Sequence, residues 1–149
     1  MPALHEPMAK LFTLEEAQTL LVEIEPLVAE MKTAFEKIRN EITQASSTAG
    51  LPPSSPRLSK HLEKRGIAPA LVVKVNALIR RIAEKGCVVN GPEAGLIDFP
   101  ALLDSEIVFL CWQHGEPQIG HWHRIPDGFA GRRPLLDNEA EPRDNASIH

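Results

Sequence analysis

The chain has 149 residues, which is enough for one domain with a buried core. Its formal net charge of −4 argues against the strongly basic classes of protein, so we expect neither a nucleic acid nor a membrane as partner. Cys87 and Cys111 form no C-x-x-C motif, and the N-terminus has no apolar run of signal-peptide length. We therefore expect two reduced thiols in a cytoplasmic protein.

The first half of the chain predicts a long helix. Residues 1–12 have the composition of a flexible arm, after which Thr13 and Glu16 match the capping box that begins a helix. Apolar residues then alternate at spacings of three and four over residues 14–45, which predicts one packing stripe along the helix. Pro26 lies opposite this stripe and is expected to kink or break the helix.

A second, shorter helix is expected to fold back on the first. Residues 45–57 are rich in serine and proline, which predicts a flexible turn. Apolar spacing then predicts a helix from about Pro69 to the glycine stop at Gly86. Because this helix cannot cover the whole stripe of the first, we expect a homodimer that forms through the N-terminal helices.

After Gly86 the apolar period shortens to two residues, which is typical of strands. We expect short strands at residues 87–90 and 96–99 and a β-hairpin over residues 106–123. The prediction is a single α+β domain, with a long antiparallel helical hairpin followed by a small antiparallel sheet of three or four strands. Its expected parts are an arm at 1–12, a domain at 13–136 (hairpin 13–86, sheet and loop 87–136) and a disordered tail at 137–149.

The register of the C-terminal hairpin decides which side chains share a face of the sheet. A two-residue turn at His114 and Gly115 is the expected connection. This turn would pair Val108 with His121 and Glu106 with His123. It would also place His123 on the face opposite Cys111, which argues against a Cys–His nucleophilic pair and favours a buried structural thiol.

Three segments of the chain form a recognisable set: FTLEEA near the N-terminus, GLIDFPA in the centre and VFLCWQHGEPQIGHWHRIPDGFAGRRPL near the C-terminus. In this order they resemble a prokaryotic family, the domain of unknown function 2203. The resemblance spans roughly residues 11–135 but implies no established activity. The positions that match the family pattern are Gly95, Asp98, Phe99, Cys111, Trp112, Gly115, Glu116, Trp122, His123, Gly128, Phe129, Gly131 and Arg132. His114 and His121 depart from it.

The first candidate site is a metal centre. His121 and His123 are two residues apart on a strand, so both side chains point to one side and can share an ion. Glu106 or Asp98 would complete a site suited to zinc, iron or manganese. The alternative is that His121 is a surface residue and that His123 is the hydrogen-bonded partner of a carboxylate.

The second candidate site is a network of Asp98, Glu116, His123 and Arg132 at the open end of the sheet. Because Glu116 is close to the expected turn, we expect two subsets. His123 would lie near Asp98 or Glu106, and Glu116 would bond with the turn or with Arg132. Alternatively, Arg132 and Arg133 would bind a small anionic ligand through their guanidinium groups.

Two classes of function follow. The long apolar stripe favours a self-associating binding or structural protein. The alternative is a metal-dependent or acid/base enzyme with a His/carboxylate site on the C-terminal sheet. No nucleophile motif, phosphate loop or dense metal motif is complete in the sequence.

Overall fold

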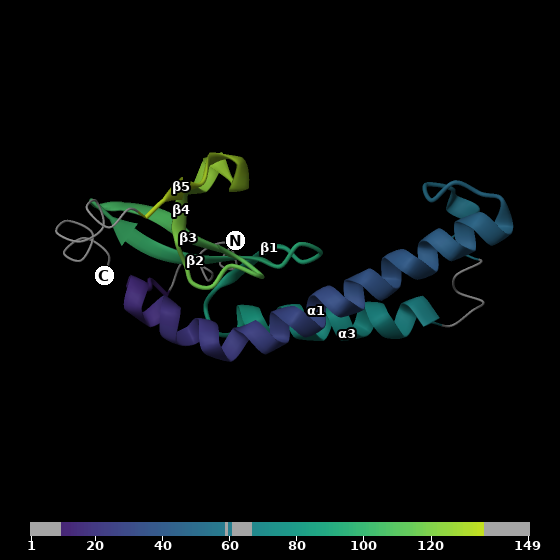
Figure 1. Ribbon diagram of the computed structural model, residues 1–149, viewed down its shortest axis with the longest axis horizontal. Coiled ribbons are helices and arrows are strands. Elements are labelled where there is room, and N and C mark those ends of the chain that lie inside the picture. Colours follow the sequence, from purple (N-terminus) through teal and green to yellow (C-terminus); the bar gives the residue numbers. More distant parts are fainter. Residues whose placement is uncertain (1–9, 59, 61–66, 136–149) are drawn as a thin grey trace, which may run out of the picture.

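The computed structural model describes residues 10–58, 60 and 67–135. Two helices form one layer and an antiparallel sheet forms the other, as the α+β prediction requires (Figure 1). Most of the expected arm and the whole expected tail lie outside the described residues. Within the described part, no helix is both long enough and apolar enough to cross a membrane.

α1 (Leu14–Ala49) begins at the predicted capping box. The Thr13 side chain accepts a hydrogen bond from the Glu16 amide, and the Glu16 carboxylate accepts one from the Thr13 amide, each at 3.0 Å. The helix is continuous through Pro26, and Figure 1 shows its axis bending in the N-terminal half, so of the expected kink or break the break does not occur. α1 also extends past the predicted end at residue 45, because it stops only at Gly50, whose φ of 68° is the left-handed cap conformation.

α3 (Ile67–Ala83) runs antiparallel to α1, which confirms the predicted helical hairpin. The direction is visible in two ion pairs, Glu23 with Lys85 at 3.1 Å and Glu30 with Lys74 at 3.3 Å. These pairs are solvent-exposed, so they add little to stability. The helices are held together mainly by buried apolar side chains, among them Leu21, Ile24, Val28 and Met31 of α1 and Val75, Leu78 and Ile82 of α3.

The sheet has five antiparallel strands in the order β1-β2-β3-β4-β5, rather than the predicted three or four. The strands are β1 (Val88–Gly91), β2 (Leu96–Leu103), β3 (Glu106–Gln113), β4 (His121–Arg124) and β5 (Arg133–Pro134). The additional strand is β5, which consists of one arginine and one proline and so has no alternating apolar pattern to reveal it. Two 3₁₀ segments, η3 (Ile125–Asp127) and η4 (Phe129–Gly131), connect β4 to β5.

The tight two-residue turn of the sheet lies between β2 and β3. Leu103 pairs with Glu106, and the intervening Asp104 and Ser105 have positive φ values of 50° and 67°. Positive φ at both positions is the geometry of the turn that matches strand twist. β2 and β3 therefore form the long hairpin at the centre of the sheet.

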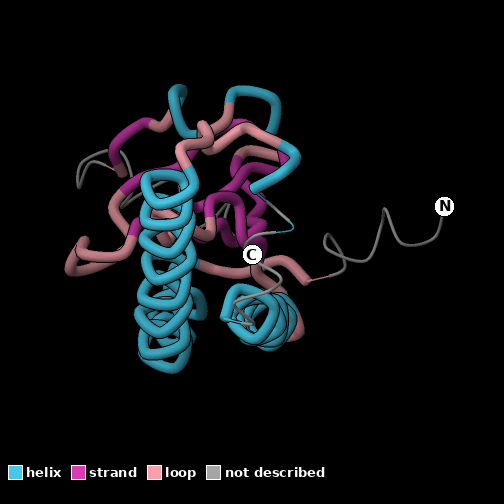
Figure 2. The backbone as a smooth tube through the Cα atoms, turned by 90° about the vertical axis from the view of Figure 1, so that its right-hand side faces the viewer, coloured by secondary structure: helices cyan, strands magenta, loops and turns pink. Residues whose placement is uncertain are grey.

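The two faces of the sheet have different neighbours. The inner face packs against the helices through Ile97, Phe99, Ala101, Leu103, Val108, Leu110 and Trp112, all of them buried. The outer face carries the alternate residues, including Asp98, Phe109 and Cys111. Figure 2 shows the short helical turns of the η3–η4 connection on the side of the strands opposite α3. The outer face of the sheet is thus covered in part by this short connection and faces away from α3.

The expected register between β3 and β4 is wrong. Cys111 pairs with His121 and Phe109 with His123, so the connection comprises residues 114–120 instead of two residues. Pro117 cannot donate to a strand ladder. The backbone of Ile119 instead bonds to the Gln18 side chain of α1, by its N–H at 3.2 Å and its carbonyl at 3.4 Å.

The new register changes the face on which two histidines lie. The expected register puts His121 and His123 on the face opposite Cys111, whereas the observed pairing places both on the outer face with Cys111. Cys111 and His123 are therefore not separated by the sheet. A site that contains either histidine therefore lies on the outer face of the sheet.

Candidate functional site

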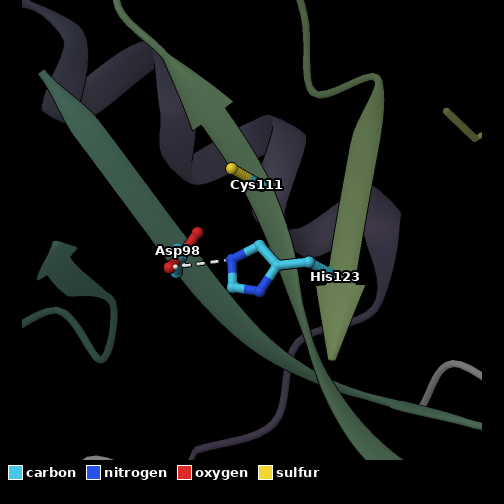
Figure 3. Close-up of side chains that lie close together, drawn as sticks. All are labelled: Asp98, Cys111 and His123. Atoms are coloured by element: carbon cyan, nitrogen blue, oxygen red, sulfur yellow. Dashed lines mark hydrogen bonds and ion pairs between the residues drawn. The ribbon is translucent and has the colours of Figure 1, made fainter. Parts of the chain in front are cut away.

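Three potential ligand side chains meet on the outer face of the sheet, each from a different strand. Asp98 on β2 is directly opposite Cys111 on β3, and His123 on β4 is two residues beyond the partner of Cys111. Figure 3 shows the His123 ring reaching across β3 toward Asp98, with the Cys111 sulfur beside them. The register alone therefore brings together a carboxylate, a thiol and an imidazole.

The three groups are buried and close. One ligand atom from each residue lies within 4.8 Å of the other two. His123 Nε2 is 3.2 Å from Asp98 Oδ2, and the exposed fractions of these two side chains are 1% and 2%. Charged and polar groups this deeply buried need partners, because an unpaired buried charge is costly.

The two carboxylate oxygens of Asp98 differ in their hydrogen-bond partners. Its Oδ2 accepts hydrogen bonds from the Asn90 side chain and lies against His123 Nε2. Its Oδ1 is buried and has no hydrogen-bond partner among the described residues. One oxygen of the carboxylate thus has unused capacity at the centre of the cluster.

The backbone fixes the orientation of the imidazole. His123 Nδ1 is 2.8 Å from the carbonyl oxygen of Arg124, and a carbonyl can only accept. Nδ1 therefore carries a hydrogen and donates it to Arg124. Nε2 is left facing Asp98 and Cys111, where it can bind a metal ion or share a second proton with the carboxylate.

Burial controls the protonation of the acid and the thiol. It raises the pKa of Asp98 above its ordinary value, although His123, Asn90 and Cys111 act in the opposite direction. Burial, followed by the charge of Asp98, raises the pKa of Cys111 to about 12. The thiol is consequently protonated at neutral pH and is no activated nucleophile, even though it shares a face with His123.

A pocket of about 390 Å³ opens above the cluster. Asp98, Cys111 and His123 lie at its floor, with Asn90 beside them. Its remaining lining comes from Leu96, Phe109, Ile125, Gly128 and Phe129, three of which belong to the η3–η4 connection. The site therefore has buried polar ligands on strands and a largely apolar roof.

A second charged cluster lies beside the first. Arg132 binds Glu116 with two nitrogen–oxygen contacts of 2.9 Å each and also donates to the Cys111 carbonyl at 3.4 Å. His121 Nδ1 is 3.8 Å from Glu116 Oε2. Burial tends to raise the pKa of Glu116, but its bonds to Arg132 and to the Gln113 amide outweigh burial and lower it.

The structure sorts the predicted site residues into two pairs. Asp98 lies with His123, and Glu116 lies with Arg132, which is the division into two subsets expected from the sequence. The predicted metal set does not assemble, because His121 faces Glu116 and the exposed Glu106 bonds to Arg124 at 3.2 Å.

Sequence reasoning missed two residues of the site, Cys111 and Asn90. The two-residue turn placed His123 on the face opposite Cys111, and correct pairing of Cys111 with His121 would have revealed the thiol as part of the site. Asn90 lies where the β1–β2 register shifts between Val89 and Gly91. Such a bulge re-aims a side chain and has no periodic signal in the sequence.

The chain belongs to the family described as "Uncharacterized conserved protein (DUF2203)", whose model matches residues 10–135. This match confirms the resemblance seen in the three sequence segments. No curated protein and no solved structure matches the chain. The family description names no activity, so the chemistry has to be argued from the site itself.

Proposed function

We propose that the protein is a metal-dependent enzyme that holds one transition-metal ion at Asp98, Cys111 and His123. The observation that carries the proposal is the convergence of three buried ligand atoms within 4.8 Å at the floor of a pocket. Two donors bound to the same tetrahedral zinc ion, each about 2.0–2.1 Å away, lie roughly 3.3 Å apart. The 3.2 Å between His123 Nε2 and Asp98 Oδ2 is close to that separation.

The ligand types favour zinc. A thiolate suits zinc or iron better than manganese, and an imidazole with a carboxylate is compatible with both. Metal-binding histidines usually donate their other ring N–H to a carbonyl or carboxylate, as His123 does to Arg124. Binding would displace the proton of Cys111, because a coordinating thiol is deprotonated by the ion.

The number of ligands favours catalysis over a structural role. Structural zinc sites are usually closed by four protein ligands, whereas catalytic sites use three and leave one position for water or substrate. Among the residues that the structure describes, three candidate ligands lie together, and the pocket adjoins them. The ion would polarise a bound carbonyl or activate a water molecule.

Metal analysis of the purified full-length protein tests this proposal. Wild-type protein is expected to contain about one transition-metal ion per chain, and Cys111→Ser and His123→Ala variants are expected to lose it. Glu106→Gln is the matched control, because Glu106 was also predicted as a ligand but bonds to Arg124 and does not belong to the cluster. His121→Ala, next to Cys111 but directed at Glu116, tests whether a histidine outside the cluster contributes. A folded wild-type protein that takes up no metal in stoichiometric amount would refute the site.

Self-association is a second candidate function, favoured by exposed apolar side chains on the helices. Val22 and Val73 are 75% and 68% exposed, and Phe35 and Ile38 farther along α1 are only partly buried. Burying such a surface would stabilise a homodimer. α1 is much longer than α3, so α3 does not cover the C-terminal part of the apolar stripe. An uncovered stripe is consistent with a homodimer.

Analytical ultracentrifugation over a range of concentrations tests the dimer. We expect a dimer mass for wild-type protein and a shift toward monomer for Val73→Lys. Ala130→Lys, at an exposed apolar residue of η4 outside the two helices, is the control and should leave the mass unchanged. A monomer mass at every concentration would refute self-association.

A further inference from the structure

The walls of the outer-face pocket differ from its floor. Above the polar cluster the lining is Leu96, Phe109, Ile125, Gly128 and Phe129, which offers two aromatic rings and two aliphatic side chains. Among the described residues that line the pocket there is no lysine or arginine. A ligand that enters beyond the metal would therefore meet apolar surface on most sides.

The terminal nitrogens of the Arg132 guanidinium are engaged, whereas its Nε is buried and has no hydrogen-bond partner among the described residues. Arg132 is held by both oxygens of Glu116 and lies with its Cζ atom 4.6 Å from the ring centre of Phe129. It supports the roof from outside the pocket instead of contributing charge to its lining. An anionic ligand would have to separate Arg132 from Glu116 to gain a cation other than the metal.

The net charge of the metal-loaded site follows from the charges of the ion and its three ligands. A divalent cation bound to the Asp98 carboxylate and the Cys111 thiolate, with a neutral His123, gives a net charge of zero. Neither an anion nor a cation in the pocket would then find an uncompensated opposite charge. Burial of a charged group next to such a neutral centre is unfavourable.

We infer that the pocket binds an uncharged, mainly apolar small molecule with a single metal-coordinating group, whose apolar part lies between Phe109 and Phe129. The inference rests on the proposed metal site and adds the class of ligand. A volume of about 390 Å³ lies within the range of pockets for small molecules. The coordinating group would fill the open metal position, and the apolar part would displace water from the walls.

Cobalt(II)-loaded, full-length protein and three probes test this inference. Imidazole, 4-phenylimidazole and imidazole-4-acetate share one donor ring and differ in an added apolar or anionic group. The visible absorption of cobalt first reports whether the ion is bound and then whether each probe coordinates it. We expect 4-phenylimidazole to bind about tenfold more tightly than imidazole, because a buried phenyl group contributes apolar area, and imidazole-4-acetate to bind more weakly than imidazole.

Two variants test whether the preference for 4-phenylimidazole arises from contacts in the pocket. Phe129→Ala should reduce the preference for 4-phenylimidazole severalfold while cobalt stoichiometry stays unchanged. Ile107→Ala is the matched control, because Ile107 is 38% exposed and Phe129 is 42% exposed, yet Ile107 does not line the pocket. This control should keep the wild-type preference.

The outcomes separate the inference from the proposed function. Stoichiometric cobalt with equal binding of all three probes, or with tightest binding of the acetate, overturns the ligand class and leaves the metal site standing. A preference that persists in Phe129→Ala places the apolar contact elsewhere and also overturns the inference. Absence of bound cobalt refutes the metal site and the ligand class together.

Discussion

The environment of each cysteine determines its chemistry. Burial raises the pKa of Cys87 to about 11 and that of Cys111 to about 12. A thiolate is the reactive form, so both thiols should be inert in folded, metal-free protein. The proposed role of Cys111 is therefore that of a ligand that loses its proton to a metal, and not that of a nucleophile.

Thiol labelling tests this assignment. In folded, metal-free protein at pH 8, both cysteines should react with a disulfide reagent far more slowly than in protein unfolded by urea. The unfolded sample is the control, since it exposes both thiols equally. Rapid reaction of one thiol in the folded protein would show that Cys111 or Cys87 is an activated nucleophile.

Glu116 should make stability depend on pH. Its pKa is lowered in the folded protein from the ordinary value of 4.5, because the bonds to Arg132 and Gln113 outweigh burial. A lowered folded pKa stabilises the folded state fully above pH 4.5, and this stabilisation is lost as the pH falls below that value. Glu116→Gln should thus reduce the free energy of unfolding by about 1–2 kcal/mol at pH 7.

Urea unfolding of both proteins between pH 3 and pH 7 measures this difference. The difference between wild type and Glu116→Gln should shrink as the pH falls below 4.5. Glu106→Gln is a suitable control, because its pair with Arg124 is more exposed. A difference for Glu116→Gln that stays constant with pH would contradict the role given to its charge.

Among the helices and strands, the features that depend on residues close together in the sequence were predicted correctly. The capping box at Thr13 and the three-four spacing of α1 involve residues within a few turns of one another, and both predictions are confirmed. The alternation of apolar residues likewise predicted the four strands β1 to β4. Of the kink or break expected at Pro26, the break does not occur, and the helix axis bends in its N-terminal half.

The register of β4 could not be predicted locally. It depends on Gln18, which is 101 positions from Ile119 in the sequence yet binds its backbone. Asp98 was still expected near His123, with Glu106 as the alternative, because no face of the sheet had been assigned to Asp98; the observed pairing brings both to the outer face. Cys111 was not expected near His123, since an odd shift in register reverses which side chains share a face.

Gly95 tests the contact between the start of β2 and α1. Its φ is 71°, and a Cβ atom there would lie 2.7 Å from the Cβ of His114 and 3.0 Å from the Cδ of Lys32. Gly95→Ala should lower the free energy of unfolding by about 2 kcal/mol or more, because it combines backbone strain with a steric clash.

Gly120→Ala is the matched control for this substitution. It has no atom within 4 Å of the added Cβ, and its φ is outside the left-handed range. Chemical denaturation measures both variants under the same conditions. Equal stability of the two variants would contradict the close packing assigned to Gly95.

At the scale of the whole molecule, packing is concentrated at one end of the helical hairpin. The buried residues of α1 lie between Ala17 and Ala34, with Ala45 as the exception farther along. Figure 1 shows the C-terminal half of α1 extending beyond the sheet. Fewer buried contacts should make that half open more readily than the half beneath the strands.

Hydrogen exchange measured by mass spectrometry tests this difference in local stability. Amides in residues 35–49 should exchange faster than those in residues 17–34 at low protein concentration. If the hairpin forms the proposed homodimer, exchange in residues 35–49 should slow as concentration rises. Equal protection along the whole of α1 would contradict this account of packing.

The central claim is that one metal ion is bound by Asp98, Cys111 and His123. X-ray absorption spectroscopy of zinc-loaded, full-length protein tests it most directly, because the spectrum reports the atoms around the ion. We expect one sulfur at about 2.3 Å and nitrogen or oxygen neighbours at about 2.0–2.1 Å. The sulfur should disappear in Cys111→Ser. A zinc environment of nitrogen and oxygen alone in the wild-type protein would contradict this claim.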